Sequence, residues 1–175
     1  LKQQKKYDEA ESLYLECLEG LRRTLGDDDP KTVTLVGNMA KLLNIQGNYE
    51  AATPYYAERL KGKRHLLGDD DPDTLIALRD LANVLYRQKK HGDAEPYCVE
   101  LLAKRRQLLG NDDSSTLESM NMMGVVLMRQ RKYLEAEPYF IESVAGGRRI
   151  FGNENASTLT SICSLAFLYT SMGEY

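Results

Sequence analysis

The sequence is poor in residues that build covalent or metal-bound frameworks. Its three cysteines, Cys17, Cys98 and Cys163, are odd in number, far apart in the chain and without a CxxC spacing. These features offer neither a disulfide framework nor a zinc site. Few and unpaired cysteines are typical of a reducing compartment, so we expect a cytoplasmic protein.

Long apolar runs and a dominant charge are also missing. No apolar stretch approaches the roughly 18 residues that span a bilayer, and no segment resembles a signal peptide. A net charge of −3 and a pI near 5.5 give no general attraction to nucleic acid or to an anionic membrane. With 42% hydrophobic and 28% charged residues, the composition is that of a folded, soluble chain. Because it begins at Leu1 and not at a methionine, we expect it to be a piece of a longer polypeptide.

What the chain does contain is one acidic loop, repeated at a fixed interval. LGDDDP occupies residues 25–30 and 67–72, and LGNDD at 109–113 and FGNEN at 151–155 are variants of it. Successive glycines of these loops lie 42 residues apart, at Gly26, Gly68, Gly110 and Gly152. Self-similarity at a period of about 20–50 residues is the mark of a solenoid, whose units bury their apolar faces only against their neighbours.

Each repeat predicts two helices. After the acidic loop, apolar residues recur at helical spacing, as at Leu78, Leu81, Val84 and Leu85. A short break follows, and then a second periodic run leads to the next loop. Small residues lie beside the apolar stripe of the first helix, where they allow close approach of the second: Ala40, Ala82, Gly124 and Ala166.

The acidic loop is predicted to end one helix and to begin the next. Its glycine suits the left-handed position just past a helix end, while Asp29 and Asp71 can cap the following helix and Pro30 and Pro72 fit its first turn. A calcium site is disfavoured, because ligands of an EF-hand alternate along the loop and end in a distal glutamate. In the second helices, Pro54, Pro96 and Pro138 predict either a bend or a later helix start.

The alanine followed four residues later by an aromatic, together with the small-residue positions, resembles the tetratricopeptide repeat. The usual tryptophan of that repeat is absent, its place taken by Val36, Leu78, Met120 and Ile162, and the period exceeds the usual length of about 34 residues. The longer unit, with LGDDDPDT at 67–74 and AEPY at 94–97 and 136–139, resembles the kinesin light chain and nephrocystin-3 subclass.

This resemblance implies an all-α, right-handed superhelical solenoid of antiparallel helix-turn-helix hairpins. Residues 1–175 would be a single fragment of a repeat array. We expect a second helix of a partial repeat at 1–25, full repeats at 30–67, 72–109 and 114–151, and a first helix of a truncated repeat at 156–173. Both ends would then lack a neighbour, and end-to-end self-association is one consequence.

The resemblance further implies a scaffold or adaptor that docks a partner peptide or helix in the concave groove lined by the first helices. Carried over residue by residue, the groove would be lined by Lys41, Asn44, Arg79, Asn83, Tyr86, Asn121, Val125, Met128 and Phe167. The asparagine pair of kinesin light chain repeats survives only singly, at Asn38 and Asn121, so we do not carry over the cargo preference of that family.

Two other functions stay open. The chain could be the regulatory or sensor arm of a larger enzyme or switch ATPase, packed intramolecularly. Basic runs near the ends of the second helices, at 61–65, 104–107 and 146–149, could form an RNA-binding ridge together with Arg22 and Arg23. The same cations complement negative helix ends, and we do not expect a nucleic-acid partner.

No catalytic pattern competes with a binding function. His65 and His91 occupy non-equivalent positions of different repeats, and no Gly-rich phosphate loop, nucleophile elbow or HExxH motif is present. We therefore predict that the chain is no enzyme and uses no cofactor, metal or small-molecule substrate.

Overall fold

The structure is a computed structural model. It describes residues 2–173, with side chains from Lys5 onward. Leu1 and Tyr175, at the two ends of the sequence, lie outside this range. Within it, eight α-helices and no strand are present, which confirms the all-α prediction. None of these helices is both long enough and apolar enough to cross a membrane. The chain forms two compact units, residues 1–89 and 90–175.

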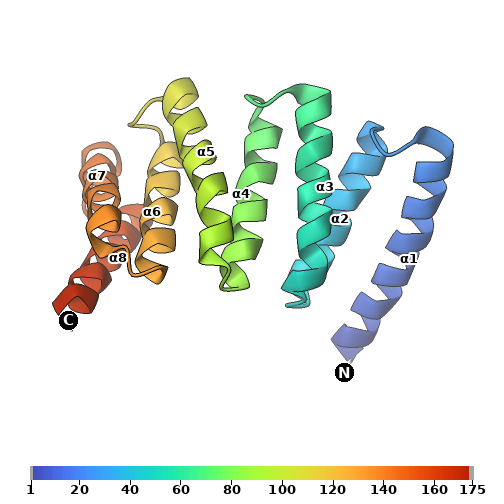
Figure 1. Cartoon of the computed structure of the whole chain (residues 1–175), viewed down its shortest axis with the longest axis horizontal. Helices are drawn as coiled ribbons and strands as arrows, with labels where there is room; N and C mark the ends of the chain where they lie inside the picture. The colour runs from blue at the N-terminus through green and yellow to red at the C-terminus, as the bar shows by residue number, and fades with distance from the viewer. Residues whose placement is uncertain (1, 174–175) are drawn as a thin grey trace. The chain divides into compact units, whose positions relative to one another are not determined.

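The first unit contains four consecutive helices. These are α1 (Lys2–Leu25), α2 (Pro30–Ile45), α3 (Tyr49–Leu67) and α4 (Pro72–Arg87). Each helix contacts the next one along the chain, so α2 and α3 form one hairpin and α4 packs against α3 (Figure 1). In repeat terms, α2 and α4 are first helices, and α1 and α3 are second helices.

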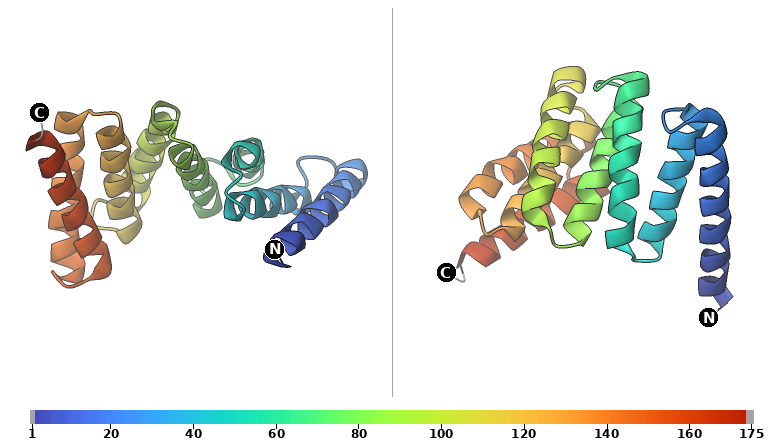
Figure 2. Two further views of the ribbon diagram at one scale, coloured as in Figure 1. Left: turned by 90° about the horizontal axis from the view of Figure 1, so that it is seen from below. Right: turned by 45° about the vertical axis from the view of Figure 1, so that its right-hand side comes forward.

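The second unit has the same construction. It contains α5 (His91–Leu109), α6 (Ser114–Arg129), α7 (Tyr133–Phe151) and α8 (Ala156–Gly173), again with contacts between successive helices. Figure 2 shows these helices from two further sides. Here α8 contacts both α7 and α6, so two first helices of this unit also touch each other.

The acidic loops end and start helices as predicted. Their glycines have φ angles of +89°, +84°, +82° and +84°, in the left-handed region that glycine occupies at little cost. The residue before each first helix caps it, since its side chain accepts a hydrogen bond from the backbone N–H two residues on. These pairs are Asp29 with Lys31, Asp71 with Asp73, Asp113 with Ser115, and Asn155 with Ser157, at 2.8–2.9 Å.

The turns inside the hairpins are less uniform. Gly47 adopts φ +78° before α3, and the equivalent Lys89 and Arg131 adopt +62° and +63°, although neither is glycine. The helices that follow begin at Tyr49, His91 and Tyr133, so Pro54, Pro96 and Pro138 lie inside them. The expectation of a later helix start is therefore wrong; the first turns form ahead of each proline.

The repeated alanines and the residues four positions later form the core of the second helices. Ala52, Ala94 and Ala136 have no exposed surface, and Tyr56, Cys98 and Phe140 are buried beside them. Burial raises the pKa of the Cys98 thiol to about 12, with a smaller effect of the Glu95 charge. Cys98 therefore packs as a small apolar side chain, as its place in the repeat predicts.

Three of the four small residues predicted on the first helices are buried. Ala40 and Ala82 are fully buried, and a Cβ added at Gly124 would lie 2.8 Å from the Phe140 ring. Ala166 is exposed, and because no second helix follows α8 in the described part of the chain, the prediction is not tested there.

Ala82 and Ala166 provide a matched pair for testing this packing. We expect Ala82→Leu to destabilise the protein by about 1–3 kcal/mol, because the added atoms must displace close-packed neighbours. The equivalent Ala166→Leu should change stability by less than about 0.5 kcal/mol, since that position is exposed. Urea denaturation followed by circular dichroism measures both, and equal midpoints for the two variants would contradict the helix contact described here.

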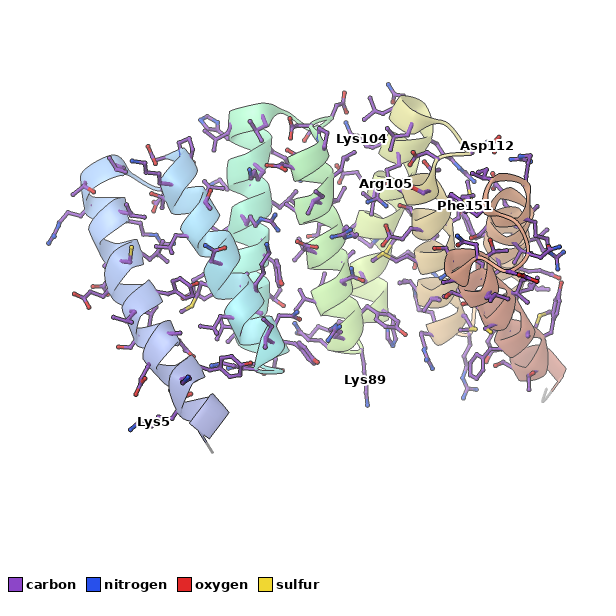
Figure 3. All side chains as sticks on the ribbon, turned by 180° about the vertical axis from the view of Figure 1, so that it is seen from behind. Lys5, Lys89, Lys104, Arg105, Asp112 and Phe151 are labelled. Atoms are coloured by element: carbon purple, nitrogen blue, oxygen red, sulfur yellow. The ribbon has the colours of Figure 1, made fainter. Side chains whose placement is uncertain are left out.

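The hairpin turn at Lys89 offers a second test. Its side chain points away from the helices (Figure 3), so a change to glycine removes no packing. We expect Lys89→Gly to stabilise the protein by about 0.5–1 kcal/mol, because glycine relieves the cost of the left-handed conformation. Lys90→Gly is the control: Lys90 has φ −84°, which gains nothing from glycine, so this variant should be neutral or less stable than the parent. Thermal unfolding measures the stability of both variants. A Lys89→Gly variant less stable than Lys90→Gly would contradict the cost assigned to the left-handed conformation of Lys89.

Candidate functional site

The predicted binding residues of the first unit lie on α2 and α4, away from the buried stripe. Lys41 and Asn83 are exposed, and Asn44, Arg79 and Tyr86 are half-buried. Long polar side chains on a fixed helical surface are suited to hold a carboxylate or a peptide backbone. Within this unit, α2 and α4 thus present the residue types that the prediction requires.

A carboxylate bound by two guanidinium groups organises this surface. Asp80 accepts from Arg59 Nη1 of α3 at 2.6 Å through one oxygen, and from Arg79 Nη2 at 3.2 Å through the other. Arg59 is buried, so its charge is stabilised mainly by this ion pair. Arg79 remains half-exposed, with further N–H donors that a ligand can engage.

Arg59 is not among the predicted binding residues, since all of those lie on first helices and Arg59 belongs to the second helix α3. The available signal was a charge at a position where the next repeat has the core residue Leu101. A second signal was the glycine opposite: a Cβ added at Gly37 would lie 2.7 Å from Arg59 Cδ. Gly37 therefore leaves room for the arginine stem across α2.

The same cluster affects Tyr56. Burial is the main cause that raises the pKa of its phenol, and the negative charge of Asp80 raises it further, while Arg59 and Arg87 oppose the shift. The phenol is thus held neutral beneath the charged groups and acts as packing, with no role as a base.

In the second unit the predicted residues differ in exposure. Asn121 and Val125 on α6 are half-buried, whereas Met128 is only 7% exposed and lies beneath the surface. Phe167 on α8 is 53% exposed, and the Arg129 guanidinium carbon lies 5.9 Å from the centre of its ring. This cation–π contact holds an aromatic face at the surface of the unit.

A second buried arginine connects α5 to α6. Arg105, labelled in Figure 3, is 5% exposed, and its Nη1 donates to the Ser115 carbonyl at 2.6 Å and to Ser119 Oγ at 2.7 Å. Nη1 also lies 3.2 Å from Glu118 Oε2. Its guanidinium is therefore part of the packing between the two helices, and the predicted basic ridge loses one of its members.

Other cations of the predicted ridge are paired with acids. Arg22 binds Asp27 at 3.0 Å and Glu58 at 2.5 Å, Arg64 binds Asp69 at 3.1 Å, and Arg106 binds Glu142 at 2.5 Å. Arg149 is paired with Asp112. These pairs offset the positive charge that would attract a nucleic acid backbone.

The acidic loops supply helix caps and ion-pair partners. Across residues 2–173, no group of three or more His, Cys, Asp or Glu side chains is placed to hold a metal ion.

Comparison with protein families gives one result over most of the chain. The tetratricopeptide repeat model matches residues 1–65, 37–107 and 115–175. A comparison with curated protein sequences gives no match.

Solved structures with the same fold come from several organisms. Tetratricopeptide-like repeats of a putative kinesin light chain of Podosopora anserina are 19% identical, with a TM-score of 0.84 over 98% of this chain and 82% of that one. BtubC from P. vanneervenii is 20% identical, with a TM-score of 0.80 over 98% of this chain and 68% of that one. The apo form of RapI is 12% identical, with a TM-score of 0.79 over 98% of this chain and 46% of that one.

The repeat spacing, the hairpins and the family match agree with one another. The chain belongs to the tetratricopeptide repeat family, with the kinesin light chain-like fold, and it is therefore a protein-interaction scaffold in the general sense of that family.

Proposed function

We propose that each unit of the chain docks a segment of a partner protein on the outward faces of its own first helices. In the first unit the docking residues are Lys41, Asn44, Arg79, Asn83 and Tyr86. In the second unit they are Asn121, Val125 and Phe167, with Met128 supporting them from below. The chain would act by holding its partner and would carry out no chemistry of its own.

The observation that carries this proposal is the charge on α2 and α4. Together these two helices carry four cations, Lys31, Lys41, Arg79 and Arg87, and only two acids, Asp73 and Asp80. Asp73 is bound by Lys63 at 2.7 Å, and that bond lowers the pKa of the carboxyl. Asp80 is bound by Arg59 and Arg79. Both acids are thus already paired, and the surface as a whole favours an acidic partner segment.

Arg79 is the anchor we assign to such a segment. Asp80 fixes one side of its guanidinium, so part of the entropy cost of holding this long side chain is already met before a ligand arrives. Its remaining N–H groups can donate to a carboxylate in the two-point geometry that arginine favours. Asn83, one turn further along α4, can bond to a peptide backbone.

The second unit offers a different kind of contact. The ring of Phe167, stacked on Arg129, provides an apolar surface with few rotamers to immobilise. Val125 and the buried Met128 complete an apolar patch on α6. Aromatic anchors of this kind carry much of the binding energy of protein interfaces.

Affinity capture from a source-cell lysate tests the proposal through a charge reversal. Arg79→Glu should reduce retention of a groove-bound partner by about tenfold or more, because it places a like charge opposite the acidic segment. Arg23→Glu makes the same charge change on an exposed position of α1, and it should leave retention unchanged. Retained proteins are identified by mass spectrometry, and circular dichroism confirms that both variants keep their helices.

Retention of the same proteins by the parent and by both variants would contradict docking on α4 and move the interaction to another surface. If no protein is retained even by the parent chain, the result favours an arm that packs within its own polypeptide.

A further inference from the structure

A small pocket opens in the second unit where α6, α7 and α8 meet. Its volume is about 150 Å³, well below the roughly 300–1,000 Å³ of pockets that hold cofactors and drug-sized ligands. A space of this size suits a single side chain. The groups that line it include Leu117, Glu118 and Asn121 of α6, Ser143 and Phe151 of α7, and Ser161 of α8.

The pocket is open because α7 lacks the long cationic residues that α3 carries at both equivalent positions and α5 at one of them. Ser143 is equivalent to Arg59, which in the first unit reaches from α3 to Asp80 of α4. Gly147 is equivalent to Lys63, which reaches Asp73, and to Arg105, which reaches the backbone and side chains of α6. In α7 these two positions hold Ser143 and Gly147, whose small size leaves an open space that a ligand can enter.

Two polar groups of this lining are buried without a hydrogen-bond partner. Asn121 Oδ1 is buried and accepts no hydrogen bond, and Thr158, a lining residue only 1% exposed, has a hydroxyl without a partner. The single charged group of the lining is Glu118, whose side chain is 57% exposed. A buried acceptor without a donor costs free energy, which a suitable ligand would recover.

The unpaired hydroxyl of Thr158 is less specific than the amide of Asn121. Thr32, Thr74 and Thr116, at the equivalent position of the other first helices, have unpaired hydroxyls as well. Asn121 differs, since its counterparts are Gly37, Arg79 and Cys163. Its orphan acceptor belongs to this pocket alone among the four repeats.

We infer that this pocket binds the side chain of an arginine from the partner segment. Leu117 and Phe151 would cover the aliphatic stem, and the planar guanidinium would donate to Asn121 Oδ1 and to the carboxylate of Glu118. Arg105 engages Glu118 through Oε2, which leaves Oε1 for the incoming group. The occupant thus repeats, from outside, the arrangement that Arg59 and Arg105 make within the chain.

This inference rests on the proposed function for the source of the arginine, and its test needs no partner protein. N-acetyl-arginine amide is titrated into the isotope-labelled chain, and backbone amide shifts are followed by NMR. We expect saturable shifts at Asn121, Gly147 and Ser161 with a dissociation constant in the millimolar range, as suits a single side chain. N-acetyl-leucine amide should leave these signals unmoved.

Two variants show whether the acceptors are responsible. Glu118→Gln removes the charge, and Asn121→Leu removes the orphan oxygen at similar volume; each should weaken binding about tenfold, the effect of losing one hydrogen bond to a charged group. Glu135→Gln, an exposed carboxylate at the start of α7, is the control and should bind as the parent does.

Three results would overturn the assignment: no shifts at the pocket, shifts that persist unchanged in both variants, or equal binding of N-acetyl-lysine amide or N-acetyl-leucine amide. None of them bears on Arg79, so docking on α4 would stand or fall by its own experiment.

Discussion

The distance between neighbouring helices is the constraint on which the other features depend. A repeat of this kind has no core of its own, so the contact between successive helices is the core. Ala52, Ala94 and Ala136 have no exposed surface, and a Cβ added at Gly62 or Gly146 would lie 2.5 Å from a side chain of the preceding first helix. Such close packing allows little change in volume. Residues that differ between repeats in size or charge at these contacts therefore change what the surface between the first helices can bind.

One position of the second helix decides the chemistry of that layer. It holds Arg59 in α3, Leu101 in α5 and Ser143 in α7. Arg59 introduces a charge that is tolerated because Asp80 pairs with it at 2.6 Å, since an unpaired buried charge would cost several kcal/mol, on the order of 3–5. Leu101 is fully buried and fills its space with apolar contacts. Ser143 instead shares a 2.8 Å hydrogen bond with Ser161 and leaves the space above it open. The residue at this one position of the repeat thus decides whether the second helix forms a buried ion pair, an apolar contact or a pocket.

The parts of the fold predicted from sequence depend on neighbours close in the chain. The left-handed glycines and the capping aspartates interact only with residues close to them in the sequence, and the apolar period of each helix is equally local. These features can therefore be predicted without a structure. Exposure along the binding face depends on other helices, which explains why Met128 was expected at the surface and lies buried. Arg59 and the pocket at Asn121 require side chains from three helices at once, and their only sequence signals are departures from the repeat: a charge for a leucine, and a serine and glycine for two cations.

Opposite charge requirements in the two units would give selectivity that affinity alone does not provide. The face of α4 favours a carboxylate, because its own acids are already paired with cations, whereas the pocket of α6, α7 and α8 favours a guanidinium, because its lining offers acceptors and a carboxylate. An acidic segment would be attracted by Arg79 and repelled by Glu118. A basic segment would be repelled by Arg79 and attracted by Glu118. Discrimination of this kind relies on the unfavourable pairing as much as on the favourable one. Each unit, taken by itself, thus selects a charge that the other disfavours.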